Sequence, residues 1–137
     1  QFYIFKAGHS PFALFTAIFY MFTETLVMFY FIGAGTAIKK TIASLGLETN
    51  GYEKVKKTKM VLFPHLTLNM ALIGTVFILG GAVQIGSISG WIHGLLFDIA
   101  FLHFLYTTMV QHRGFKENVE IISELDQHSE PVSEISA

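Results

Sequence analysis

Residues 60–85 contain no Asp, Glu, Lys or Arg, and only His65, Asn69 and Gln84 interrupt their apolar character. A hydrocarbon core of about 30 Å is crossed by about 20 helical residues, so this stretch is long enough to span a lipid bilayer. Continuous apolar runs of 18 or more residues are typical of transmembrane helices rather than of helices in soluble domains. We therefore expect lipid, and not water, to be the main solvent of this segment.

Two further stretches have the same character. Residues 11–38 hold Glu24 as their one side chain expected to be charged, and residues 91–110 are interrupted by Asp98 and two histidines. None of the runs shows the two-residue alternation of a membrane β-barrel strand, which favours helices. The prediction is an all-α integral membrane bundle of three transmembrane helices, at about residues 11–38, 60–85 and 91–110, with a short amphipathic C-terminal helical segment.

The amino-acid composition excludes several kinds of binding site and enzyme. Hydrophobic residues make up 52% of the 137 residues and charged residues 14%, about half the charged share of a soluble domain. The absence of cysteine excludes disulfides, thiolate metal sites and iron–sulfur clusters. The net charge of −1, without a Gly-rich phosphate loop, argues against nucleic acid as a partner. Neither a Ser-His-Asp arrangement nor a His-Glu-x-x-His run can be assembled, which argues against a stand-alone hydrolase.

The basic residues predict the orientation. Of nine, six lie between the first two runs and two follow the third, whereas Lys6 alone lies on the other side. Positive charge gathers on the cytoplasmic side of membrane proteins. We therefore expect an inner or plasma membrane protein with its N-terminus outside and its C-terminus in the cytoplasm. Its parts would be an outer N-terminal segment (1–10), a transmembrane domain (11–112) and a cytoplasmic acidic tail (113–137).

Two local features bear on the helix bounds. Residues 52–59 can extend the second helix out of the membrane, which would place Pro64 inside it and favour a kink. The alternative is a helix that begins near Pro64. In the tail, Ile121, Ile122 and Leu125 indicate the short amphipathic segment.

Ionisable side chains within a bilayer are costly, so each one indicates a site or a partner. Counting 1.5 Å per helical residue from the cytoplasmic ends places His65 about 7 Å and His103 about 10 Å deep. The same count places Asn69, Asp98 and Glu24 nearer the middle of the membrane. On the first helix, Glu24 shares a stripe with Thr16, Tyr20 and Thr23, which we expect to face protein.

The first interpretation of these residues is a cofactor site. Two imidazoles at equal depth on adjacent helices suit the axial ligation of haem b, with His65 and His103 as ligands and Asn69 beside them. Glu24 or Asp98 could then assist quinone chemistry.

The second interpretation is a Cu, Fe or Zn site formed by His65, His103, Asp98 and Glu24, with Asn69 supporting the ligands. Asp98 and His103 are five residues apart, which rotates them by about 140° on a straight helix. Either a π-bulge realigns them, or the third helix uses two faces. The third interpretation needs no cofactor, because polar side chains often join membrane helices by hydrogen bonds.

Three helices offer few buried positions for so many polar side chains, and Gly86, Gly90 and Gly94 recur every four residues, a pattern that favours close helix packing. We therefore expect two kinds of partner, the lipid bilayer and other membrane subunits in a hetero- or homo-oligomer. The predicted function is a small subunit of a redox or energy-converting membrane complex, binding haem b or quinone. Such a subunit would carry electrons or be non-catalytic rather than act as an enzyme alone. The alternatives are a structural accessory subunit without a cofactor and a metal-binding oxidoreductase subunit.

Overall fold

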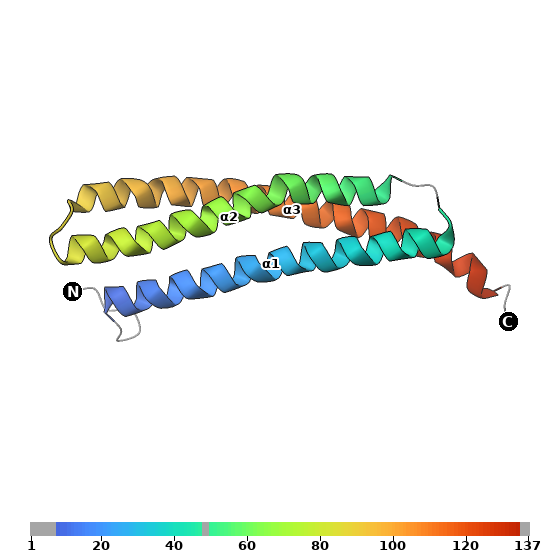
Figure 1. Ribbon diagram of the computed structural model, residues 1–137, viewed down its shortest axis with the longest axis horizontal. Coiled ribbons are helices and arrows are strands. Elements are labelled where there is room, and N and C mark those ends of the chain that lie inside the picture. The colour runs from blue at the N-terminus through green and yellow to red at the C-terminus, as the bar shows by residue number, and fades with distance from the viewer. Residues whose placement is uncertain (1–7, 48–49, 135–137) are drawn as a thin grey trace. The chain divides into compact units, whose positions relative to one another are not determined.

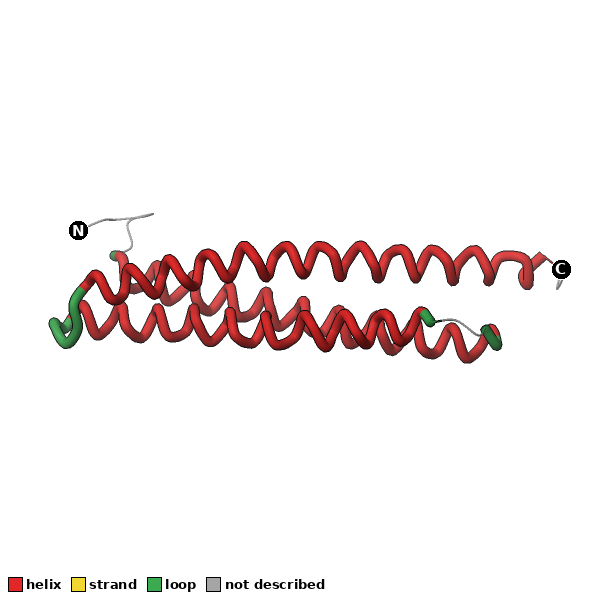
Figure 2. The backbone as a smooth tube through the Cα atoms, turned by 90° about the horizontal axis from the view of Figure 1, so that it is seen from above, coloured by secondary structure: helices red, strands yellow, loops and turns green. Residues whose placement is uncertain are grey.

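The computed structural model describes residues 8–47 and 50–134. It contains three helices, α1 (His9–Leu45), α2 (Gly51–Gln84) and α3 (Gly90–Glu134) (Figure 1). Within the described residues only helices, turns and loops occur (Figure 2). The prediction of an all-α chain with three helices is confirmed.

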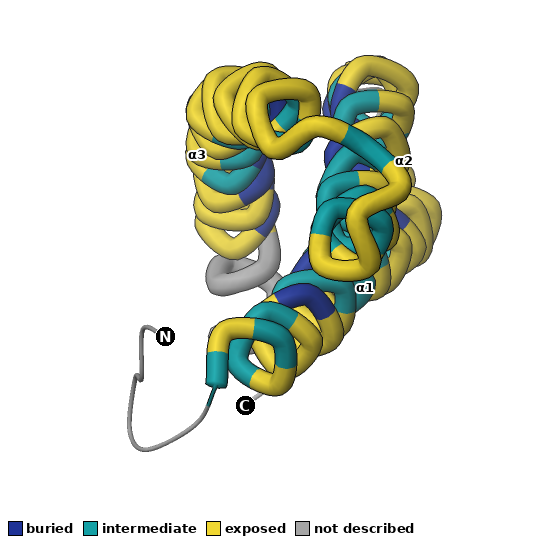
Figure 3. Tube along the Cα trace, turned by 90° about the vertical axis from the view of Figure 1, so that its left-hand side faces the viewer, coloured by how far each residue is buried: buried dark blue, intermediate teal, exposed yellow. Residues whose placement is uncertain are grey.

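All three helices are long and apolar enough to cross a membrane. Within the most apolar 18-residue window of each helix, only 11% of the residues are buried. Figure 3 shows how much of each helix is exposed. In water so much exposed apolar surface would be unfavourable, so the expected contact with a lipid bilayer agrees with the structure.

Two helices end with the same backbone arrangement. Gly46 and Gly86 have φ values of 63° and 76°, in the left-handed region that glycine adopts without strain. The following residues close the ends, with Leu47 N donating to Ile42 O at 3.2 Å and Ser87 N donating to Ala82 O at 2.9 Å. These are the hydrogen bonds of the Schellman motif, which satisfies the last carbonyl groups of a helix.

Two helices are longer than their apolar runs. α2 begins at Gly51, so Pro64 lies inside it and the alternative of a helix starting near Pro64 is wrong. α3 continues from the third run to Glu134, so the predicted amphipathic segment is part of this helix. Lys6 and the rest of residues 1–7 of the predicted outer segment lie outside the described residues.

The chain divides into two compact units. The first takes in Gln1–Leu26 and His65–Thr107, and the second takes in Val27–Pro64 and Thr108–Ala137. Each unit contains one stretch of every helix. The second unit has a small apolar core formed by four buried residues: Ile38, Val55, Ile121 and Leu125.

Of the three repeating glycines, Gly90 lies close to another helix, since a Cβ there would lie 3.8 Å from Cγ1 of Val83. Gly86 lies after the end of α2 with its positive φ, and a Cβ on Gly94 would meet nothing within 4 Å. In the second unit Gly114 is instead enclosed, because a Cβ there would lie 2.9 Å from Thr58 Cγ2 and 3.0 Å from Phe31 Cζ. Gly114 therefore allows α3 to pass close to α1 and α2.

Candidate functional site

A chain of polar side chains begins at a buried carboxylate in the first unit. Glu24 on α1 is 3% exposed, and its carboxylate shares a hydrogen bond with the hydroxyl of Tyr20, one turn earlier. The Tyr20 hydroxyl also accepts a hydrogen bond from Nδ2 of Asn69 on α2. Asn69 is fully buried. Because a phenol can donate and accept at once, these three side chains form one continuous hydrogen-bonded chain.

The chain continues to a histidine on α3. Nδ1 of His103 lies 3.0 Å from Oδ1 of Asn69. An amide oxygen can only accept, so Nδ1 carries the hydrogen and Nε2 of the neutral ring keeps its lone pair. Thr107, one turn on, donates its hydroxyl hydrogen to the carbonyl oxygen of His103 at 2.9 Å. The ring of His103 is thus held in one orientation and one tautomer.

His103 Nε2 is a buried atom without a hydrogen-bond partner among the described residues. A buried polar atom left unpaired is unfavourable and indicates a missing ligand, proton or ion. In His103, one ring nitrogen is hydrogen-bonded to a fixed oxygen and the other has no partner in the residues that the structure describes. Metal-binding histidines in proteins are held in the same way, with the nitrogen that does not bind the metal donating to an oxygen.

His65 lies beside this ring. The centroids of the His65 and His103 rings are 5.7 Å apart, with an angle of 43° between the ring planes. Tyr106 packs edge-on against His65, with centroids 5.0 Å apart. The structure therefore brings together His65, Asn69 and His103, which the sequence placed at neighbouring depths. Binding of haem b or quinone by these residues stays a prediction.

Asp98 is not part of this cluster. Its side chain is exposed, whereas His103 is partly buried. α3 is a regular α-helix between the two residues, without a π-bulge, so Asp98 and His103 lie on different faces of the helix. Among the described residues, no group of three or more His, Cys, Asp or Glu side chains lies close enough to hold a metal ion. His65, His103, Asp98 and Glu24 are therefore not gathered into one ligand set.

The stripe on α1 is only partly as expected. Glu24 is buried and Tyr20 partly so, but Thr16 and Thr23 are exposed and donate to the carbonyl oxygens of residues 12 and 19 of their own helix. A hydroxyl that bonds to its own helix does not need a protein-facing position.

Two members of the cluster, Tyr20 and Thr107, are not among the predicted site residues. Tyr20 links Glu24 to Asn69, and the fully buried Thr107 contacts His103. Their spacing of four residues, Tyr20 before Glu24 and Thr107 after His103, is the signal that could have indicated them, because such pairs share a helix face.

Comparison with protein-family models, with curated proteins and with solved structures finds no match for this chain.

Proposed function

We propose that the chain is a small subunit of a multi-subunit redox complex in the membrane and that His65 and His103 bind haem b. The observation that carries the proposal is the buried, unpartnered Nε2 of His103, whose lone pair is fixed by the bond between Nδ1 and Asn69. The second imidazole lies next to it. Two neutral imidazoles from neighbouring helices are what axial ligation of a haem requires.

The surrounding residues have distinct roles in this proposal. Asn69 orients the His103 ring, and Tyr20 with Glu24 fixes the amide of Asn69. Apolar helices around the two histidines would exclude water from a bound haem. In such an environment, nearby hydrogen bonds and dipoles have a larger effect on the redox potential of the haem. A haem held in this way supplies reversible one-electron transfer.

The exposed surface supports a role inside a larger assembly. Asp98 is exposed on an apolar helix, between the exposed side chains of Phe97 and Ile99. A carboxylate facing lipid is strongly unfavourable, so another membrane subunit or a water-filled passage would cover this position. The membrane would be an inner or plasma membrane, with the N-terminus outside and the C-terminus in the cytoplasm.

The spectrum of the complex, purified in mild detergent, tests the haem. We expect a Soret band that is lost in His103→Ala and in His65→Ala, because each variant removes one axial ligand. His112→Ala is the matched control, since His112 is exposed on the same helix outside the cluster and its loss should leave the band unchanged. A featureless spectrum without bound metal would instead identify a structural accessory subunit.

One observation favours a second role at the same site. The hydrogen-bonded chain from Glu24 through Tyr20 and Asn69 to His103 joins a carboxylate to the imidazole, and because such chains transmit polarisation, reduction of a bound haem would favour uptake of a proton at this cluster. In the haem-loaded complex we expect the midpoint potential to depend on pH and to lose that dependence in Tyr20→Phe, which breaks the chain at its hydroxyl. Equal pH dependence in both proteins would exclude this second role.

A further inference from the structure

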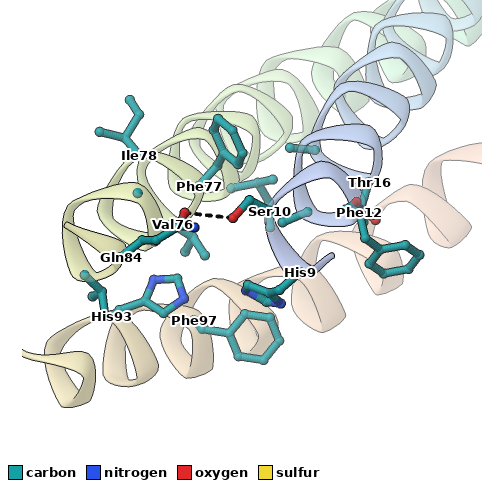
Figure 4. A pocket seen from close by; sticks show the side chains of 16 residues that line it. His9, Ser10, Phe12, Thr16, Val76, Phe77, Ile78, Gln84, His93 and Phe97 are labelled. Atoms are coloured by element: carbon teal, nitrogen blue, oxygen red, sulfur yellow. Dashed lines mark hydrogen bonds between the residues drawn. The ribbon is translucent and has the colours of Figure 1, made fainter. Parts of the chain in front are cut away.

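A second site lies in the first unit, at the end where α2 and α3 are joined. Stretches of α1, α2 and α3 line a cavity of about 720 Å³. Figure 4 shows its lining side chains, with His9 and His93 at one end and Phe12, Phe77 and Phe97 around it. We call it the His9/His93 cavity. Its volume lies within the range of about 300–1,000 Å³ that small-molecule sites occupy.

The polar groups of this cavity are few and fixed. Ser10 Oγ donates to Oε1 of Gln84 at 2.8 Å, a hydrogen bond that joins the start of α1 to the end of α2 (Figure 4). Nδ1 of His93 is buried and has no hydrogen-bond partner in the described part of the chain. The His93 ring rests against Gly80, where a Cβ would lie 3.2 Å from Cε1 of the ring. The unpaired nitrogen is therefore held in place at the cavity.

The lining also limits the charge of a ligand. None of the 16 described residues that form it is Lys, Arg, Asp or Glu. Apart from the imidazoles of His9 and His93, these residues offer an anionic group only hydroxyl, amide and apolar groups, and burying a charge without a strong partner is unfavourable. The lining therefore suits an uncharged ligand with an apolar body and a small number of hydrogen-bonding atoms.

We propose that the His9/His93 cavity binds a lipid-soluble quinone or quinol. Its flat ring fits between the aromatic side chains, which favour offset or edge-on contact with another ring. One ring carbonyl of the quinone can accept from Nδ1–H of His93, in the tautomer that carries the hydrogen on this nitrogen, and the other can accept from the amide group of Gln84. An apolar tail reaches the lipid between the helices. This site is separate from the cluster of His65 and His103, and its occupation does not depend on a bound haem.

The chain provides its own probe for this binding. Trp91 is its only tryptophan and lies two residues before His93. The purified protein is placed in nanodiscs of neutral phospholipid and titrated with a benzoquinone that carries a ten-carbon chain, while Trp91 fluorescence is followed. We expect quenching that saturates at about one quinone for each protein chain.

Two variants test the cavity and one controls for the substitution. Gly81 lines the cavity, and a Cβ there meets nothing within 4 Å, so Gly81→Phe fills the space without a clash at its first atom. We expect the half-saturating concentration to rise about tenfold or more. His93→Leu removes the unpaired nitrogen and should weaken binding roughly three- to tenfold. Gly33→Phe introduces the same side chain at an open helical glycine that does not line the cavity, and should bind as the unsubstituted protein does.

The outcomes separate the proposal from simpler explanations. Quenching that rises linearly with the quinone content of the lipid, equally in all proteins, would show partition into the bilayer alone and would overturn the proposal. Weaker binding in Gly81→Phe but not in His93→Leu would show a slot for acyl chains without recognition of the ring oxygens, which also contradicts it. Saturable binding in a protein whose spectrum shows no haem would support this inference while refuting the haem proposal.

Discussion

At the scale of the residue, Asn118 on α3 stands out in the second unit. Its side chain is fully buried, and neither Oδ1 nor Nδ2 has a hydrogen-bond partner among the described residues. It lies one turn before Ile121, a member of the apolar core of that unit. Leaving buried polar atoms unpaired costs about 1–3 kcal/mol. Asn118 is therefore a source of instability within this chain when it is alone.

Replacing Asn118 with leucine should stabilise the isolated chain. Leucine has a similar volume and no polar atoms, so we expect Asn118→Leu to raise the free energy of unfolding by about 1–2 kcal/mol. Denaturant unfolding in detergent, followed by circular dichroism, measures the change. Gln127→Leu, at an exposed position of the same helix, is the control and should change little. A loss of stability in Asn118→Leu would contradict the interpretation of Asn118 as an unpaired buried amide.

The site residues were predicted from the sequence only in part. Counting helical rise placed His65 and His103 at neighbouring depths, and their rings lie side by side. Depth alone does not determine direction, so Asp98 was included in the metal set although it is exposed on another face of α3. Tyr20 was recognised as part of a stripe, but its bond to Asn69 depends on how α1 is rotated against α2. Only tertiary packing determines that rotation.

At the scale of the element, Gly114 determines how the helices of the second unit approach one another. The lack of a side chain lets Thr58 of α2 and Phe31 of α1 reach the backbone of α3. Phe115, the next residue, packs against both Tyr30 and Phe31, with ring centroids 4.9 and 5.0 Å apart. Nearby, Thr58 Oγ1 donates to Oε2 of Glu117 at 2.5 Å. Side chains of all three helices therefore meet within about one turn of Gly114.

Adding a methyl group at Gly114 should separate these helices. The Cβ in Gly114→Ala would overlap with Thr58 and Phe31, and overpacking of this kind costs about 1–3 kcal/mol. Thermal unfolding in detergent should show a lower midpoint for this variant. Gly33→Ala is the matched control, because its Cβ meets nothing within 4 Å and alanine favours a helix over glycine by about 0.5–1 kcal/mol. Equal midpoints in the two variants would contradict the close approach.

Helix bounds were predicted less well than the presence of helices. The apolar runs indicated three membrane spans because lipid requires a helix over its whole thickness. The polar residues that close the third run were interpreted as the end of the span, but α3 continues to Glu134. Outside the membrane a helix persists where one face is buried, and Ile121 and Leu125 supply such a face. A change in hydropathy marks a change of solvent and not the end of a helix.

Across the whole molecule, the helices contain both apolar stretches long enough to span a membrane and charged stretches beyond them. Each helix crosses from one unit to the other, and all six lysines between the first two apolar runs lie in the second unit. Four of them, at positions 54, 56, 57 and 59, form part of the first turns of α2. By the positive-inside rule this unit would face the cytoplasm, and the loop after α2 would lie on the opposite side of the membrane.

Cysteine labelling tests this orientation directly. The sequence has no cysteine, so each single variant carries one reactive thiol. In intact cells a membrane-impermeant maleimide should label Ser87→Cys, in the exposed loop after α2, and should label Ser44→Cys, near the end of α1, only after permeabilisation. The reverse pattern would invert the orientation. Labelling of both thiols in intact cells would show that residues 44 and 87 do not lie on opposite sides of the membrane.

The length of α3 has a mechanical consequence. Its 45 residues extend about 67 Å along the helix axis, more than twice the roughly 30 Å of hydrocarbon that a membrane presents. The rest of the helix lies in the second unit, where Ile121 and Leu125 belong to the apolar core. Removing two turns from this part would shorten the helix by about 11 Å.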